Sequence, residues 1–375
     1  MARTYFCPRC LNTVNPQDVQ YRTRRGEPAE KPRLEYDRGV REWVQAVWTG
    51  DPDPIHRVHP QQRAARDEHG IHAQCPQGHP IPARAFTIPS LVVGLVGEPS
   101  SGKTVYLGTL LEQLDRGRLL PYLDFFLDER SQRIRDQLFH DFYVSGAVPF
   151  PTSAYEGDAG REAITETARR GDTEQFYLSF FDASGEQNSL GDQGRTNRFL
   201  YVADVVMHFI TPEALSLPRR YPARRVDQRQ AWHMTNSWIQ TAIEAGEPRR
   251  AHAAVILTKS DDIAPGVLDI LEDAREDLNY SGGLSLLRAA QVIKEDSGLI
   301  RDFLRSTDAG RPLSIRLEEA YRSVSYHLVS ATGQPADPTS RTFPHRRPQR
   351  VFDPLLSSLV HTGVLDAHEG LQVLR

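Results

Sequence analysis

The 375-residue sequence predicts an α/β fold, with three layers around a mostly parallel sheet, preceded by a small cysteine-containing module. Two observations predict it. From about residue 89, short apolar runs alternate with segments whose apolar residues recur at helical spacing, and this alternation builds a mostly parallel sheet covered on both faces. All three cysteines lie before that point, in two turn-like segments. We therefore expect a module at residues 1–88 and a larger α/β domain at residues 89–375.

The composition is that of an ordinary globular protein. Charged residues make up 25% of the chain and hydrophobic residues 39%. A formal net charge of −4 provides no general attraction to nucleic acid or to anionic membranes. No apolar run approaches the roughly 18 residues of a membrane span, and the first seven residues lack the apolar core of a signal peptide. Three cysteines do not suggest a disulfide framework, so we expect a reduced, cytoplasmic protein.

Two short segments near the start of the chain carry metal-ligating residues. Cys7 and Cys10 form a C-x-x-C pair, and Cys75 is followed four residues later by His79. Two such turns can surround one Zn²⁺ with a Cys₃His tetrahedron. Such a site would be closed and structural. The pattern resembles a zinc ribbon, and the resemblance covers only the two turns.

The long spacing between the two turns departs from a compact ribbon. Residues 12–73 would form an insertion, whose middle, at residues 34–48, has a helical pattern. His69 and His72 are alternatives to His79 as the fourth ligand. In the competing interpretation, the two cysteine segments never meet. A redox C-x-x-C is disfavoured, because the surroundings read as a turn rather than as a strand opening a helix.

A complete P-loop motif, Gly-Glu-Pro-Ser-Ser-Gly-Lys-Thr, occupies residues 97–104. An apolar run at residues 91–96 precedes it, and leucines at helical spacing follow it, so the motif has the strand-loop-helix context that its function requires. The loop amides and the start of the helix would cradle phosphate. We expect Lys103 to reach the β- and γ-phosphates and Thr104 to bind Mg²⁺. The residues expected to line this cradle are Gly97, Ser100, Ser101, Gly102, Lys103 and Thr104.

Two strand-like stretches at residues 161–168 and 174–182 are joined through a short polar turn and predict a hairpin. A small GTPase places its Mg²⁺-sensing threonine just before such a hairpin. Thr152, in a proline-flanked segment, is therefore the candidate for that role. Thr165 or Thr167 could serve only if the hairpin prediction is wrong.

The second strand of this hairpin ends in Asp182, which begins a D-x-x-G motif that Gly185 completes. A carboxylate at this position can hold Mg²⁺ through water, and the Gly185 amide can bond the γ-phosphate. In many P-loop enzymes with this motif, the next residue is a glutamine that orients the attacking water. Here Glu186 follows and Gln187 comes one place later. Either a bound nucleotide is hydrolysed slowly, or Gln187 or a partner supplies the group that orients the water. No arginine finger within the chain can be assigned, because Arg195 and Arg198 are most simply surface residues.

Polar residues follow two later strands. After the apolar run at residues 253–257, Thr258-Lys259-Ser260-Asp261 resembles the guanine-recognition motif. The Asp261 carboxylate could accept from N1–H and the exocyclic amine of guanine, a donor pair that adenine lacks. Lys259 would lay its aliphatic stem over the base. The alternative is a polar loop without this role, in which case the protein would be an ATPase.

Ser330 and Ala331 follow another apolar strand, which begins at Tyr326. They resemble the last guanine-contacting motif, in which the Ala331 amide would bond guanine O6. Further elements lie in the expected order between and after these motifs. They are a strand at residues 205–210, a helix marked by Trp232, Ile239 and Ile243, and a closing helix marked by Leu355, Leu356, Leu359 and Val360.

With these motifs in this order, the chain from about Pro89 onward resembles a TRAFAC-class, Ras-like GTPase, a P-loop NTPase fold. Together with the zinc-ribbon-like turns, it is similar to bacterial double-GTPase proteins of predicted conflict systems. The resemblance implies GTP or GDP and Mg²⁺ as ligands. It also implies a cytoplasmic, GTP-controlled component of a defence or regulatory system.

Two arginine-rich stretches lie around prolines and look like loops. They contain Arg219, Arg220, Arg224, Arg225 and Arg229, and Arg341, Arg346, Arg347 and Arg350. Such runs are usually solvated faces. The alternative is a docking surface for an acidic partner or nucleic acid, although the scarcity of interleaved aromatic residues disfavours single-strand stacking.

The sequence therefore supports a regulatory GTPase that acts on a protein partner. An ATPase and a non-hydrolysing adaptor that presents the zinc module remain the alternatives. The partner and the oligomeric state are left open.

Overall fold

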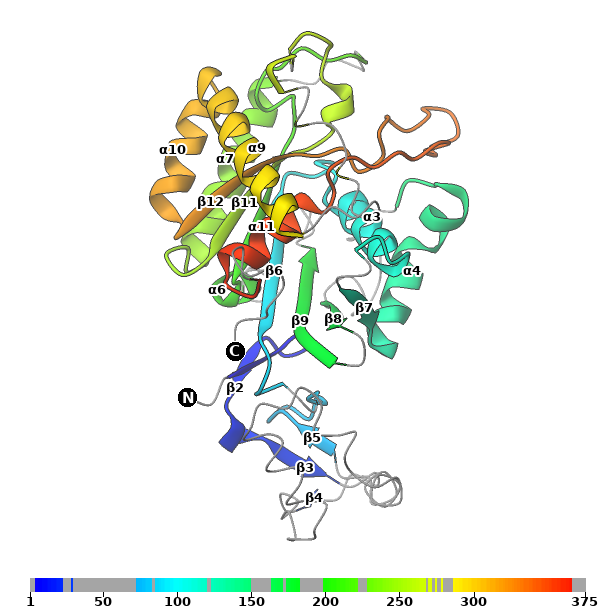
Figure 1. Cartoon of the computed structure of the whole chain (residues 1–375), viewed down its shortest axis with the longest axis vertical. Coiled ribbons are helices and arrows are strands. Elements are labelled where there is room, and N and C mark those ends of the chain that lie inside the picture. Colours follow the sequence, from blue (N-terminus) through cyan, green and yellow to red (C-terminus); the bar gives the residue numbers. More distant parts are fainter. Residues whose placement is uncertain are drawn as a thin grey trace. The chain divides into compact units, whose positions relative to one another are not determined.

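The computed structural model describes residues 4–22, 28–29, 72–82, 85–119, 123–149, 163–170, 173–182, 198–221, 228–267, 269–271, 274, 278 and 286–365 (Figure 1). The chain forms two compact units. One consists of Met1–Ser90 with Ala168–Tyr177, and the other of Leu91–Thr167 with Leu178–Arg375.

The first unit is built from short antiparallel strands. β1 (Tyr5–Cys7) pairs with β2 (Asn12–Val14), and β3 (Gln20–Arg22) pairs with both β4 (Pro28–Ala29) and β5 (His72–Gln74). The insertion expected at residues 12–73 thus contributes strands to this unit. The helix expected at residues 34–48 lies outside the described residues. The small core of the unit consists of Tyr5, Cys7, Val14, Cys75, Ile81 and Ala85.

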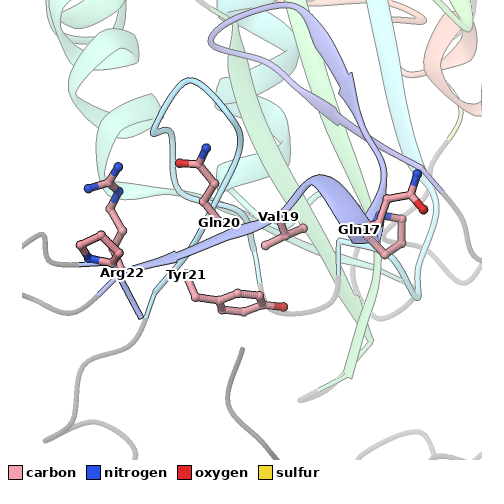
Figure 2. A pocket seen from close by; sticks show the side chains of 7 residues that line it. Gln17, Val19, Gln20, Tyr21 and Arg22 are labelled. Atoms are coloured by element: carbon pink, nitrogen blue, oxygen red, sulfur yellow. The ribbon is translucent and has the colours of Figure 1, made fainter. Parts of the chain in front are cut away.

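A pocket of about 530 Å³ lies beside β3 in this unit. Figure 2 shows side chains of the short 3₁₀ helix η1 (Pro16–Asp18) and of β3 along it. It is lined by Pro16, Gln17, Val19, Gln20, Tyr21, Arg22 and Pro28. Among the described residues, none that the sequence predicts to bind metal or nucleotide lies in this lining.

A seven-stranded sheet forms the centre of the larger α/β region, in the order β12-β11-β10-β6-β9-β8-β7. The four strands on one side, β6 (Ser90–Gly97), β10 (Val205–Ile210), β11 (His252–Leu257) and β12 (Ser323–Leu328), are mutually parallel. All six residues of β10 and of β11 are buried, as expected for strands covered on both faces. The predicted mostly parallel α/β fold is therefore confirmed.

The predicted hairpin corresponds to β8 (Ile164–Arg170) and β9 (Thr173–Asp182), which are neighbours in the sheet. Two intervening residues are too few for a parallel crossover, so these strands run antiparallel. The edge strand on this side of the sheet is β7 (Asp124–Leu127), which was not predicted from the sequence. It extends the sheet beyond β8.

The predicted helices after the P-loop, before β11 and near the chain end correspond to α3 (Lys103–Asp115), α7 (Gln228–Ala245) and α11 (Asp353–His361). The remaining helices are α4 (Glu129–Ser145), α6 (Arg198–Val202), α9 (Leu286–Ser306) and α10 (Gly310–Ala320), with 3₁₀ helices η4 (Ser260–Asp262) and η5 (Asp269–Leu271). Among the described parts of the chain, no helix is both long enough and apolar enough to cross a membrane.

Helix α4 packs against α3 at a point where α3 has no side chain. A Cβ atom added at Gly108 would lie 2.7 Å from the ring of Phe139, and the Tyr143 hydroxyl donates to the Gly108 carbonyl at 3.1 Å. Phe139 is completely buried there. The glycine therefore allows the close approach of the two helices.

Candidate functional site

The P-loop forms a tight turn between β6 and α3. Its backbone has positive φ at Ser100 (63°) and Gly102 (93°). A Cβ atom at Gly97 would lie 2.8 Å from the Phe209 carbonyl oxygen. Only glycine therefore allows the end of β6 to lie this close to β10. Ser101 is fully buried within the loop. This local geometry places the start of α3, with its positive dipole end, directly after the loop.

Lys103 is 5% exposed and points back into the loop. Its ammonium donates to the carbonyl oxygens of Gly97 at 2.8 Å and Glu98 at 2.9 Å. Burial lowers the pKa of Lys103, while Asp182 and Glu98 act in the opposite direction. A buried cation surrounded by neutral carbonyls would gain from a phosphate group, because an anion offsets its lost hydration.

Thr104 and Asp182, two of the three predicted Mg²⁺ ligands, are in direct contact. The Thr104 hydroxyl donates to Asp182 Oδ2 at 2.6 Å. Asp182 Oδ1 is buried and has no hydrogen-bond partner among the described residues. Burial raises the pKa of Asp182, and both Lys103 and Thr104 partly counter this. A hydroxyl and a carboxylate are the hard oxygen ligands that Mg²⁺ prefers, and a cation would satisfy the unpaired oxygen, so these residues fit the ion.

The predicted guanine-recognition sequence follows β11 as a turn and the single 3₁₀ turn of η4. Lys259 takes a left-handed conformation (φ 53°) at the start of this turn. Thr258 is buried, and its hydroxyl oxygen lies 3.2 Å from the position of a Cβ on Gly102. This loop therefore adjoins the P-loop directly.

Asp261 lies against the loop that follows β12. The Ser330 hydroxyl donates to Asp261 Oδ1 at 2.5 Å, and the same hydroxyl accepts from the Gly333 amide at 2.8 Å. Burial raises the pKa of Asp261, while the Ser330 hydrogen bond lowers it. The Thr109 hydroxyl on α3 donates to the Ala331 carbonyl at 3.1 Å. Two motifs about 70 residues apart in sequence thus meet beside the P-loop helix.

Asp262, which the sequence analysis did not single out, has a different role from its neighbour Asp261. It is buried and forms an ion pair with Arg219, and its Oδ1 accepts from the Tyr221 amide at 3.1 Å. Arg219 also pairs with Glu213 at 2.8 Å. Asp262 therefore holds the loop after β10 against the loop after β11. The two consecutive aspartates, Asp261 and Asp262, were the sequence signal that could have indicated this second role.

The interpretation of the arginine-rich stretches as solvated faces is wrong for three of their members, because these pair with buried acids. Besides Arg219, Arg346 pairs with Glu112, and Arg350 pairs with Asp296 at 2.6 Å and with Asp353. Arg229 lies in helix α7, not in a loop. Each of these arginines has a partner distant in sequence, namely Asp262, Glu112 and Asp296 respectively, so local composition could not reveal these ion pairs.

Several predicted residues lie outside the described parts of the chain: Thr152, Gly185, Glu186, Gln187, Arg195 and His69. The alternative threonines, Thr165 and Thr167, both lie within strand β8. Thr165 is buried, with its hydroxyl 3.3 Å from that of Ser179. Because both alternatives lie within a strand of the hairpin, Thr152 remains the candidate for the Mg²⁺-sensing threonine.

The two cysteine segments of the first unit meet. Ligand atoms of Cys7, Cys10, Cys75 and His79 all lie within 4.8 Å of one another. The sulfurs of Cys10 and Cys75 are 3.7 Å apart, and the Cys75 sulfur lies 3.4 Å from His79 Nδ1. Zinc bonds of about 2.3 Å to sulfur and 2.0 Å to nitrogen give tetrahedron edges of roughly 3.5–3.8 Å. The donor set and its spacing therefore fit Zn²⁺, and the interpretation in which the segments never meet is wrong.

The fold and the site define the class: a P-loop nucleotide-binding protein with a GTPase domain and an N-terminal Cys₃His cluster. A model of the family described as Double-GTPase 2 matches residues 91–293, which is more than half of the chain. The chain therefore belongs to the double-GTPase 2 family. No curated protein matches it. The matched range contains the P-loop, Asp182 and Asp261, and it ends before Ser330.

Proposed function

We propose that this protein is a regulatory GTPase that binds GTP with Mg²⁺, hydrolyses it and changes the conformation of its switch loops to engage a protein partner. The observation that carries the proposal is the hydrogen bond between Ser330 and Asp261. It supports the proposal because it joins the Asp261 carboxylate to the loop after β12, while Thr258 of the same β11 loop lies beside the P-loop. A carboxylate there accepts from the two donors that guanine offers and adenine does not.

In this mechanism the described residues bind and orient the nucleotide. Lys103 turns from the loop carbonyls to the β- and γ-phosphates, and Lys259 covers the base. Thr104 and Asp182 would hold Mg²⁺, which when bound supplies positive charge against the phosphates. Thr152 is proposed as a further ligand of the ion. Glu186 and Gln187 are the candidates for orienting the attacking water, and the Gly185 amide for the γ-phosphate.

The Cys₃His cluster is proposed as a structural Zn²⁺ site. Its closed donor set leaves no coordination position for a substrate, so it would stabilise the first unit rather than carry out chemistry. Three thiols gathered as metal ligands also accord with a reducing, cytoplasmic setting. A role in a bacterial conflict system, with a protein partner, is the part of the proposal that rests on the family resemblance alone.

Calorimetric titration with Mg-GTP and Mg-ATP tests the base specificity. We expect tight GTP binding and weak ATP binding. Asp261→Asn should weaken GTP binding by about 10- to 100-fold, because a charge-assisted hydrogen-bond pair to the base is lost. The same variant should improve binding of xanthosine nucleotide, whose base carries an oxygen where guanine has its amine.

The adjacent Asp262→Asn is the matched control. It should lower the melting temperature through the lost Arg219 ion pair without improving xanthosine nucleotide binding. Tighter binding of ATP than of GTP would overturn the proposal in favour of an ATPase. Turnover that is equal in the wild type and in Lys103→Ala would instead support a non-hydrolysing adaptor.

A further inference from the structure

The chain after β12 folds into an excursion at residues 330–349, which we call the arm. Its two ends are joined by reciprocal backbone hydrogen bonds between Ser330 and Gln349, at 3.2 and 2.8 Å. The Arg347 amide also donates to the Thr332 carbonyl at 2.8 Å. Gly333 has φ 75°, and a Cβ atom there would lie 2.3 Å from the Arg347 carbonyl oxygen. The arm is thus a closed, ordered loop whose base includes the partner of Asp261.

Beyond its base, the arm is fastened to the P-loop helix α3. The Arg346 guanidinium makes a two-pronged ion pair with Glu112, at 2.5 and 3.0 Å. The two side chains are only 15% and 9% exposed. The guanidinium also lies over the ring of Phe142 on α4, 4.3 Å from its centre. A pair this shielded, with fork geometry and a ring beneath it, fixes orientation far better than an exposed pair.

The arm also pairs with the segment that leaves α4. The Phe343 amide donates to the Gly146 carbonyl at 2.7 Å, and the Val148 amide donates to the Arg341 carbonyl at 2.9 Å. Gly146 has φ 71°, and a Cβ atom there would lie 2.6 Å from the Phe343 carbonyl oxygen. Figure 1 shows the arm, in orange, extending from β12 past α3 toward α4. The chain continues from Val148 to Thr152, four residues on.

We propose that the arm is a positioning element that holds the base-contacting turn and the residues leading to Thr152 in one fixed relation, with Arg346 as its main positioning residue. One end of the arm carries Ser330 and Ala331, and its far part carries the strand pairing with Gly146 and Val148. Between them, Glu112 fastens it to α3, the helix that begins with Lys103. The inference rests on the proposed function, because it names what holds two parts of that nucleotide site.

Amide hydrogen exchange of the full-length protein tests the arm directly. In Arg346→Ala, exchange of peptides covering residues 146–149 and 330–334 should increase about tenfold, because the fastening to α3 is lost and the pairing opens more often. Arg347→Ala is the matched control. It removes an exposed arginine one residue away and should leave exchange unchanged. Unchanged exchange in Arg346→Ala would overturn the proposal.

Release of GDP gives the functional readout. Both Arg346→Ala and Gly146→Ala should release GDP roughly tenfold faster than the wild type and Arg347→Ala, since either change displaces the arm from one of its supports. Gly146→Ala acts by steric conflict with the Phe343 carbonyl, so it perturbs the arm without touching the ion pair. Each variant is compared at a temperature well below its melting point, so that unfolding does not contribute.

The outcomes separate the two proposals. If the wild type binds no guanine nucleotide, the proposed function fails, and the exchange measurement still decides whether the arm holds residues 146–149. If the wild type binds GDP but both variants release it at the wild-type rate, the arm does not position the site.

Discussion

At the scale of single residues, Glu166 is a carboxyl group that the fold holds in an unusual state. It is 2% exposed in strand β8, and its Oε2 has no hydrogen-bond partner within the described part of the chain. Burial raises the pKa of Glu166 to about 8, with Asp115 and Asp128 adding to the shift and Arg135 opposing it. The side chain is therefore protonated at neutral pH in the folded protein.

This protonation makes the stability of the protein depend on pH. The folded state retains the Glu166 proton up to about pH 8, whereas the unfolded chain releases it near the ordinary pKa of 4.5. The contribution is fully present below pH 4.5 and is lost as the pH rises through 8. We expect the loss of this contribution to lower the free energy of unfolding by roughly 3 kcal/mol between pH 5 and pH 8.

Denaturant titrations at several pH values measure this dependence. Glu166→Gln should remove the part of the slope that Glu166 contributes, because an amide does not titrate. The control Glu319→Gln, at an exposed position on α10, should keep it. Parallel curves for the wild type and Glu166→Gln would show that the carboxyl is ionised in the folded protein.

At the scale of elements, helix α4 connects several parts of the larger unit. Asp128 caps its start, accepting from the Ser131 amide at 2.6 Å. The Ser131 hydroxyl in turn accepts from the Thr165 amide of β8 at 2.9 Å. At the other end, Gly146 closes the helix in a left-handed conformation and begins the pairing with the arm. The helix therefore joins the sheet, the P-loop helix and the arm.

The cap at Asp128 gives a quantitative test of this element. Asp128→Ala should lower the free energy of unfolding by about 1 kcal/mol, because a helix N-terminal amide loses its acceptor. Glu129→Ala, at the next and exposed position, should change it by only a few tenths. Chemical denaturation at neutral pH measures both. An equal effect of the two substitutions would mean that general charge at the helix start matters more than the cap.

At the scale of the whole molecule, the Cys₃His cluster and the residues predicted to bind nucleotide belong to different compact units. Cys7, Cys10, Cys75 and His79 lie in the unit that contains the chain start. Lys103, Thr104, Asp182, Asp261 and Ser330 lie in the other. Each of these two groups of residues is positioned by the strands of its own unit.

Removing the metal should therefore affect one unit more than the other. We expect about one equivalent of zinc in the purified protein, and Cys7→Ser should lose most of it, because three ligands bind zinc far less tightly than four. The affinity for GTP, measured by calorimetry, should change by less than about threefold. Less than about half an equivalent of zinc in the wild type, with no further loss in Cys7→Ser, would exclude the zinc site.

Much of the fold could be predicted because its signals are local. The run at residues 91–96 and the leucines after Lys103 identify a strand and a helix by periodicity alone, and both are present. Strand β7 and helix α4 were not foreseen. Both have a local signal, because residues 123–127 are mostly apolar and the buried Ile134, Leu138, Phe139 and Phe142 of α4 recur at helical spacing. The sequence could not show that β7 joins the sheet beside β8, because that pairing depends on how the whole sheet is assembled.

The sequence by itself determined the order of the motifs, the α/β class and the two short segments that contain the cysteines, because each depends on residue types at short, fixed spacings. Only the tertiary structure decided that Ser330 supports Asp261, that Asp262 holds Arg219 and that Arg346 fastens the arm to Glu112. These contacts join residues 43 to 234 positions apart. Their existence depends on which strands become neighbours, and that is settled by packing of the whole sheet and its helices rather than by any local pattern.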